Sequence, residues 1–89
     1  MKAIITVVGK DQVGIIAAVC NKLAEYNVNV LDIRQTVMQE YFTMMMVTDV
    51  SKCAVPLAEF CAIMEESGKE KGLSIRVQRE DIFEAMHRI

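Results

Sequence analysis

Residues 28–48 read VNVLDIRQTVMQEYFTMMMVT, and this stretch decides the fold because it predicts two neighbouring antiparallel strands. From residue 28 to residue 38 apolar and polar side chains alternate, as in an edge strand with one exposed face. The apolar side of that strand consists of Leu31, Ile33 and Val37. Residues 41–48 are apolar on both faces, which favours an interior strand. Only Gln39 and Glu40 separate the two runs, so we expect a hairpin.

The segment before the hairpin predicts a strand and a helix. Residues 2–8 are apolar on both faces, which indicates a second interior strand. After the loop at residues 9–14 the apolar side chains recur at helical spacing. The expected buried stripe is Ile16, Val19, Cys20 and Leu23. We expect this helix to end near Asn27, a residue type that tolerates a left-handed terminator.

The segment after the hairpin predicts a helix, a strand and a short terminal helix. The second helix starts at Pro56 and stops near Gly72. Its expected buried stripe is Leu57, Phe60, Cys61 and Met64. Alternation over residues 73–77 predicts a second edge strand. Residues 81–84 have the spacing of a capping box, so we expect a short C-terminal helix there.

The predicted order is β-α-β-β-α-β followed by the terminal helix. Right-handed crossovers place the interior strands at the centre of a four-stranded antiparallel sheet and both helices on one face. This is the ferredoxin-like sandwich of the α+β class, and we expect residues 1–89 to form a single domain. The central strands are apolar on both faces, so the second face needs a cover, either the terminal helix or another subunit.

Composition excludes several classes of function. The formal net charge is -2 and the basic residues are scattered, so we expect no contact with nucleic acid. No apolar run reaches the roughly 18 to 20 residues of a membrane span, so we expect no membrane contact. The three cysteines have the spacing of neither a redox pair nor a zinc knuckle. We therefore expect a cytoplasmic protein without a metal site or a cofactor.

The sequence shows no assembled set of catalytic residues. In residues 9–14, GKDQVG, Asp11 stands where a dinucleotide fingerprint needs its second glycine. No Ser or Cys has a neighbouring His, because His87 is the only histidine of the chain. We therefore expect no enzymatic activity. An enzyme that uses a metal at Asp11 and Asp32 is the alternative, which elemental analysis would test.

The loop after the first strand is where a small ligand could bind. The backbone N–H groups of Gln12, Val13 and Gly14 would be free at the start of the helix, and Gly14 has no side chain to obstruct a ligand. Asp11 has two interpretations: as the N-cap it would accept one of these N–H groups, and turned outward it would hold an ammonium group. The two roles together would suit an amino acid, with its carboxylate on the backbone donors.

Two motifs, GKDQVGIIA at residues 9–17 and NVNVLDI at residues 27–33, resemble the ACT domain, a regulatory module of metabolic enzymes that commonly binds amino acids. The likeness extends to the last residues of the chain, as in small stand-alone bacterial ACT proteins, and more distantly to the glycine cleavage system repressor. The resemblance implies an effector at a homodimer interface, contacted by the first loop and the start of the second strand. The implied ligand-binding residues are Asp11, Gln12, Val13, Gly14, Ile15 and Asn29.

We therefore predict an amino acid sensor that passes its state to a partner protein. The alternative is a protein-interaction module that dimerises without any effector and uses its apolar sheet face or its edge strands. The methionines at residues 44–46 favour that alternative only if they are exposed, since at strand spacing methionine usually belongs to the core. Both side-by-side and face-to-face dimers bury apolar surface, so the sequence leaves the dimer type open.

Overall fold

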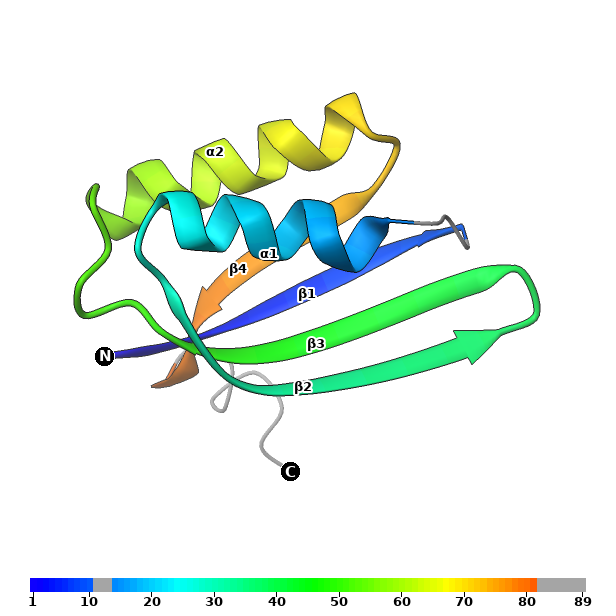
Figure 1. The fold of residues 1–89 in the computed structure, drawn as a ribbon, viewed down its shortest axis with the longest axis horizontal. Helices are drawn as coiled ribbons and strands as arrows, with labels where there is room; N and C mark the ends of the chain where they lie inside the picture. The colour runs from blue at the N-terminus through cyan, green and yellow to red at the C-terminus, as the bar shows by residue number, and fades with distance from the viewer. Residues whose placement is uncertain (11–13, 82–89) are drawn as a thin grey trace.

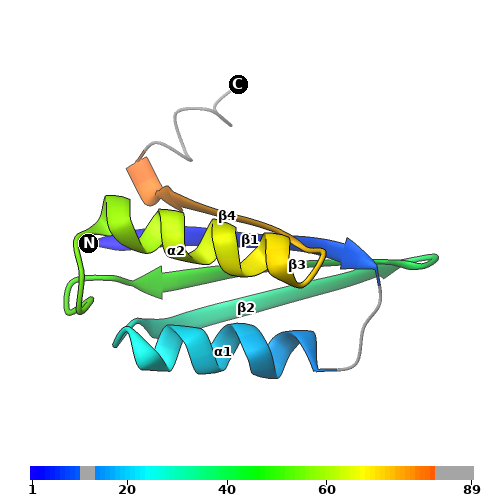
Figure 2. The ribbon, with the colours of Figure 1, turned by 90° about the horizontal axis from the view of Figure 1, so that it is seen from above.

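The computed structural model describes residues 1–10 and 14–81, which form one antiparallel sheet with two helices on a single side of it (Figure 1 and Figure 2). The elements in chain order are β1 (Lys2–Lys10), α1 (Ile15–Glu25), β2 (Asn29–Met38), β3 (Tyr41–Asp49), α2 (Leu57–Glu70) and β4 (Ser74–Arg79). The strands lie in the order β2-β3-β1-β4. The predicted ferredoxin-like fold, with two interior and two edge strands, is confirmed. The expected C-terminal helix falls largely on residues 82–89, which lie outside the described residues.

The core lies between the sheet and the helices. Alternate residues of the two central strands point into it, and they are buried beneath the helices. The helices contribute Leu23 from α1 and Phe60 and Met64 from α2. Met44 and Met46 are completely buried, so two of the three consecutive methionines belong to the core.

The buried stripe of α1 differs from the prediction by one position. Ile15, Val19 and Leu23 are buried, whereas Ile16 is 36% exposed and Cys20 is half-buried. Two apolar stripes lie side by side on this helix, and the sequence pattern alone does not choose between them. The helix starts at Ile15 and ends before Asn27, whose φ of 61° confirms the predicted left-handed terminator.

Strand β2 also departs from simple alternation. A β-bulge lies between Val30 and Asp32, so the predicted alternation of Leu31 and Ile33 is interrupted there. Ile33 packs against the core, while Leu31 is 48% and Val37 is 59% exposed. Val37 pairs with Phe42 near the turn of the β2–β3 hairpin. That end of the hairpin extends beyond the start of α1 (Figure 1). Of the three side chains predicted to point inward, Ile33 contacts the core, whereas Leu31 and Val37 are exposed.

The second face of the sheet is partly apolar, as predicted. Ile4 is buried there, but Val8 and Met45 are each more than a third exposed. Arg34 and Arg76 flank Met45 and Thr6 on this face through the strand register. No helix within residues 1–10 and 14–81 is long and apolar enough to cross a membrane.

Candidate functional site

Gly14 marks the start of α1, where the sequence predicts ligand contacts. Its φ of 89° requires a residue without a Cβ penalty, and the space where a Cβ would point is open to at least 4 Å. The first helical hydrogen bond is donated by the Ala18 N–H to the Gly14 carbonyl oxygen at 2.9 Å. A ligand could therefore approach the backbone here without meeting a side chain of Gly14.

The structure tests the predictions for the other residues of this loop only in part. The N-cap position of α1 belongs to Gly14, so the interpretation of Asp11 as the N-cap is wrong. The positions of Asp11, Gln12 and Val13 lie outside the described residues. The side chain of Ile15 is buried in the core, so only its backbone N–H remains available to a ligand. Gly14 adopts the left-handed conformation that turns the chain into the helix.

Asn29 lies far from Gly14 in the same chain. It is the first residue of β2 and pairs with Asp49, which in turn pairs with Lys2 at that end of the sheet. Lys10, which precedes the loop, pairs with Tyr41 at the opposite end. The two ends are separated by α1, whose 11 residues span about 16 Å. One chain therefore does not bring the two predicted halves of the site together.

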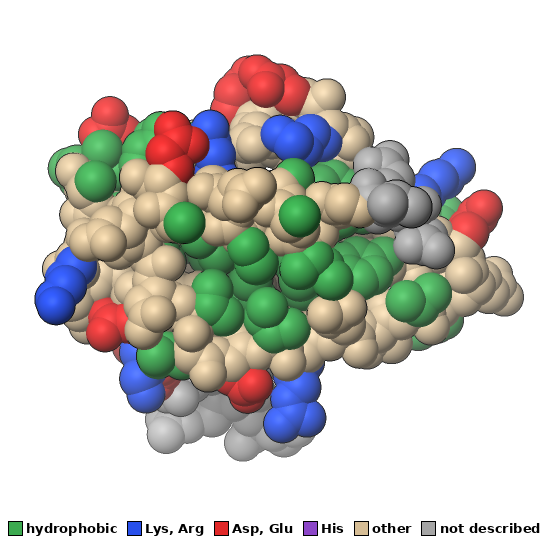
Figure 3. Space-filling view, in the orientation of Figure 1, with side chains coloured by type: hydrophobic (Ala, Val, Ile, Leu, Met, Phe, Trp, Pro, Cys, Tyr) green, Lys and Arg blue, Asp and Glu red, His purple; other side chains and the backbone are tan. Residues whose placement is uncertain are grey.

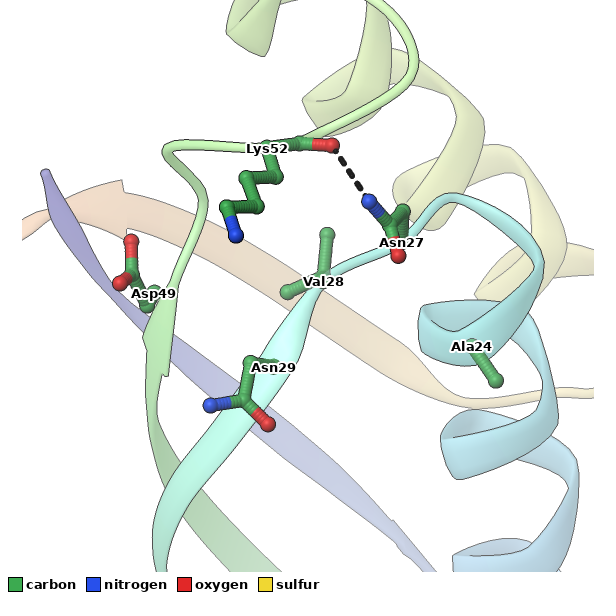
Figure 4. Close-up of a pocket in the computed structure, with 6 residues that line it drawn as sticks. All are labelled: Ala24, Asn27, Val28, Asn29, Asp49 and Lys52. Atoms are coloured by element: carbon green, nitrogen blue, oxygen red, sulfur yellow. Dashed lines mark hydrogen bonds between the residues drawn. The ribbon is translucent and has the colours of Figure 1, made fainter.

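A cavity of about 450 Å³ surrounds Asn29 (Figure 4). Four elements meet there: the last turn of α1, the start of β2, the end of β3 and the loop before α2. The lining residues are Ala24, Asn27, Val28, Asn29, Asp49 and Lys52. One cation, one anion and two amides thus share the wall with two small apolar side chains, which suits a small polar ligand.

Two hydrogen bonds hold the loop before α2 against the end of α1. The Asn27 side-chain amide donates to the Lys52 carbonyl oxygen at 3.0 Å, as Figure 4 shows. The Ala54 N–H donates to the Tyr26 carbonyl oxygen at 2.9 Å. Asn27 has a left-handed backbone conformation, and its side-chain amide points toward the loop. The residue that terminates α1 therefore also holds the backbone of Lys52.

Asp49 is held in its charged form by its neighbours. The Ser51 hydroxyl donates to Asp49 Oδ1 at 2.6 Å and the Ser51 N–H donates to the same oxygen at 2.9 Å. The N-terminal ammonium lies 3.7 Å from that oxygen. The hydrogen bonds from Ser51, with a smaller contribution from the N-terminal charge, lower the pKa of Asp49 below its ordinary value of 3.8.

Lys52 brings a charge into the cavity that no described residue neutralises. Its ammonium extends toward Asp49 and Val28 in Figure 4, yet the described part of the chain holds no ion pair to it. Asp49 and Lys52 were not among the predicted ligand-binding residues, because they lie between the predicted hairpin and the predicted second helix. The signal that could have located the anchored loop is the Asp-x-Ser spacing of Asp49 and Ser51, which favours a local turn.

A second feature is an apolar surface that joins α1 to the edge strand. We name it the α1–β2 surface, and it consists of Ile16, Cys20 and Ala24 on α1 and Leu31, Ile33 and Val37 on β2. Figure 3 shows hydrophobic side chains gathered between these two elements. The α1 residues are spaced four apart and lie on the flank away from Lys22, which faces α2. Ala24 also lines the cavity, so the surface and the cavity adjoin.

Comparisons with known proteins agree with the fold. A model of the ACT domain matches residues 2–78. A UPF0237 protein of Clostridium acetobutylicum is 55% identical over 89 residues, the full length of both chains. An ACT domain protein from Streptococcus pneumoniae has a TM-score of 0.83 at 45% identity and covers 94% of each chain. A candidate glycine cleavage system transcriptional repressor has a TM-score of 0.73 at 22% identity, covering 88% of this chain and 44% of its own. The resemblance that the two motifs predicted is confirmed.

Proposed function

Because the chain belongs to the ACT domain family, whose members are generally regulatory ligand-binding modules, we propose that it senses an amino acid at a homodimer interface. It acts without catalysis and passes the state of the dimer to a partner protein. The cytoplasm is its proposed location, which the three free cysteines support because disulfides are rare in that compartment.

The observation that carries this proposal is the separation of Gly14 from Asn29. Strand β2 is an edge strand that runs from Asn29 to Met38. If two copies pair their β2 strands antiparallel about a two-fold axis, the start of one β2 meets the end of the other. The end of β2 lies at the same end of the sheet as Lys10 and the loop before Gly14. The pairing therefore brings Asn29 of one copy to the Gly14 loop of the other.

The α1–β2 surface supports the same arrangement. An edge strand leaves N–H and C=O groups unpaired, and a second β2 would satisfy them. The exposed Leu31 and Val37 lie on this strand, and Ile16 lies on the adjoining flank of α1. Pairing the strands would also bring the two α1 helices together through this flank. A side-by-side dimer thus buries apolar surface and completes the ligand site at once.

The mechanism follows from linkage between binding and assembly. An amino acid that touches the Gly14 loop of one copy and the Asn29 cavity of the other binds the dimer better than the monomer. It therefore stabilises one arrangement of the subunits by its differential affinity. In this mechanism the Asp11 carboxylate would hold the ammonium group, and the backbone N–H groups of Gln12 to Ile15 would hold the ligand's carboxylate.

The experiment combines sedimentation velocity with a thermal-shift panel of the amino acids. Leu31→Lys places two like charges in the proposed interface, so we expect the dimer to dissociate about a hundredfold more readily. Met45→Lys, at a position exposed on the open sheet face, is the matched control and should leave the dimer intact. One amino acid at about 100 times its Kd should add roughly 2.7 kcal/mol to wild-type stability.

Two outcomes would contradict the proposal. A dimer that Met45→Lys breaks and Leu31→Lys leaves intact would indicate face-to-face pairing. A stable dimer that no amino acid stabilises would favour the interaction module that works without an effector.

A further inference from the structure

One face of the sheet carries apolar side chains that no described element covers. They are Ile4 and Val8 of β1 and Met45 and Val47 of β3, on the face away from the helices (Figure 1), and we name them the open-face strip. Ile4 pairs with Val47, so side chains of the two central strands adjoin across the strip. None of the four belongs to the core beneath the helices, and Val8 and Met45 are each more than a third exposed. An apolar strip of this kind favours a cover.

The described chain ends beside this strip. Gln78 of β4 pairs with Ile4, so the end of β4 lies at the same end of the sheet as Ile4. Arg79, the last residue of β4, forms an ion pair with Asp81 at 3.1 Å. Residues 82–89 therefore continue from the edge of the sheet next to the open-face strip.

The last eight residues, IFEAMHRI, have the sequence pattern of an amphipathic helix. At about 3.6 residues per turn, Ile82, Met86 and Ile89 would fall on one side. Glu84 and Arg88 would fall on the opposite side. Eight helical residues span about 12 Å, which exceeds the roughly 10 Å from β4 across β1 to β3. A helix here is therefore long enough to cover the open-face strip.

Charges around the strip favour this segment over a second copy of the chain. Arg34 of β2 and Arg76 of β4 lie on either side of the strip, and Asp32 offsets one of the two charges. Two copies packed face to face would therefore each bring a net positive charge into one interface. The last eight residues bring no net charge, because Glu84 balances Arg88. They are also attached beside the strip, so their effective concentration there is high.

We infer that residues 82–89 form a helix that packs on the open-face strip of their own chain. The apolar side of this helix, with Ile82 and Met86, covers Met45 and Val47, and its polar side stays in solvent. The cover blocks face-to-face pairing of two copies, so the edge strand β2 is left as the surface for association. The inference does not depend on any ligand and stands apart from the proposed function.

Methyl NMR on the full chain tests the inference. With isotope-labelled methionine and valine methyl groups, we expect nuclear Overhauser effects from Met86 to both Met45 and Val47. A sample that mixes labelled and unlabelled protein separates contacts within one chain from contacts between copies. The inference is overturned if residues 82–89 show no contact with the strip, if their contacts occur only between copies, or if the Met45 methyl groups of two copies contact each other.

Two variants place the same charge on opposite sides of the expected helix. Met86→Lys should uncover the strip, so binding of the dye ANS, which fluoresces on apolar surfaces, should rise at least about threefold. His87→Lys is the matched control and should bind the dye as the wild type does. Equal dye binding by the two variants would overturn the inference. Circular dichroism shows whether both variants fold, and if Met86→Lys does not, the methyl contacts of the wild type decide.

Discussion

At the scale of single residues, the hydrogen bonds to Asp49 change its pKa. Asp49 accepts two hydrogen bonds from Ser51, and these contacts stabilise its charged form. A carboxyl group whose pKa is lowered in the folded state contributes stability above its unfolded pKa, and the contribution is lost as the pH falls through the folded pKa. The loss therefore belongs to the acid range below about pH 4.

Ser51→Ala should raise the pKa of Asp49 toward its ordinary value of 3.8, because the hydroxyl that donates at 2.6 Å is the largest cause of the shift. The measurement is an NMR titration of the Asp49 carboxyl carbon in wild type and variant. Asp32, whose pair with Arg34 lies elsewhere on the sheet, serves as the internal reference. A pKa of Asp49 that is the same in both proteins would show that Ser51 does not hold the carboxylate.

At the scale of elements, the close approach of α2 to β4 depends on one glycine. A Cβ at Gly68 would lie 2.9 Å from Ile75 Cγ1 and 3.0 Å from the Leu73 carbonyl oxygen. The backbone oxygen cannot move aside as a flexible side chain would. The helix can therefore pack this closely against the strand only because Gly68 has no side chain.

Gly68→Ala should lower the free energy of unfolding by about 1 to 3 kcal/mol through overpacking, even though alanine favours helices more than glycine does. Urea denaturation followed by circular dichroism measures the change. Gly72→Ala is the control: its φ is 71° but no atom lies within 4 Å of the added Cβ, so its cost is conformational, roughly 1 kcal/mol. If the Gly68→Ala variant is as stable as the wild type, the close approach is contradicted.

The order and type of the elements could be predicted because periodicity reports directly which faces are buried. The two-sided β1 and β3 lie inside the sheet and the alternating β2 and β4 at its edges, as their patterns require. The exact faces could not be predicted. Ile15 rather than Ile16 enters the core, and Leu31, at the bulge after Val30, is 48% exposed. Both outcomes depend on packing between elements, which a local pattern does not contain.

The site could be predicted only where a local feature marks it. Gly14 and Asn29 were predicted from their motifs, and Gly14 adopts the left-handed conformation at the start of α1. Lys52 could not be predicted, because it reaches the cavity through a hydrogen bond between residues 25 positions apart in the chain. Such a contact exists only in the folded chain.

At the scale of the whole molecule, one chain separates the two groups of residues that are predicted to bind a ligand. The Gly14 loop and the Asn29 cavity lie at opposite ends of α1, and two edge strands paired about a two-fold axis would unite them in two equivalent sites. Each site would then take its loop from one copy and its cavity from the other. That shared arrangement is the central claim of the proposed function.

Mixing two inactive variants tests this claim most directly. Asp11→Ala and Asn29→Ala should each lose amino acid binding as homodimers, because every site then lacks one contact. After subunit exchange, a mixed dimer has one site with both changes and one site with neither, so calorimetry on the mixture should show binding restored at wild-type affinity. A mixture of two separate preparations of Asp11→Ala is the control and should stay inactive. If the mixed variants bind no better than either alone, the site is not shared between two copies.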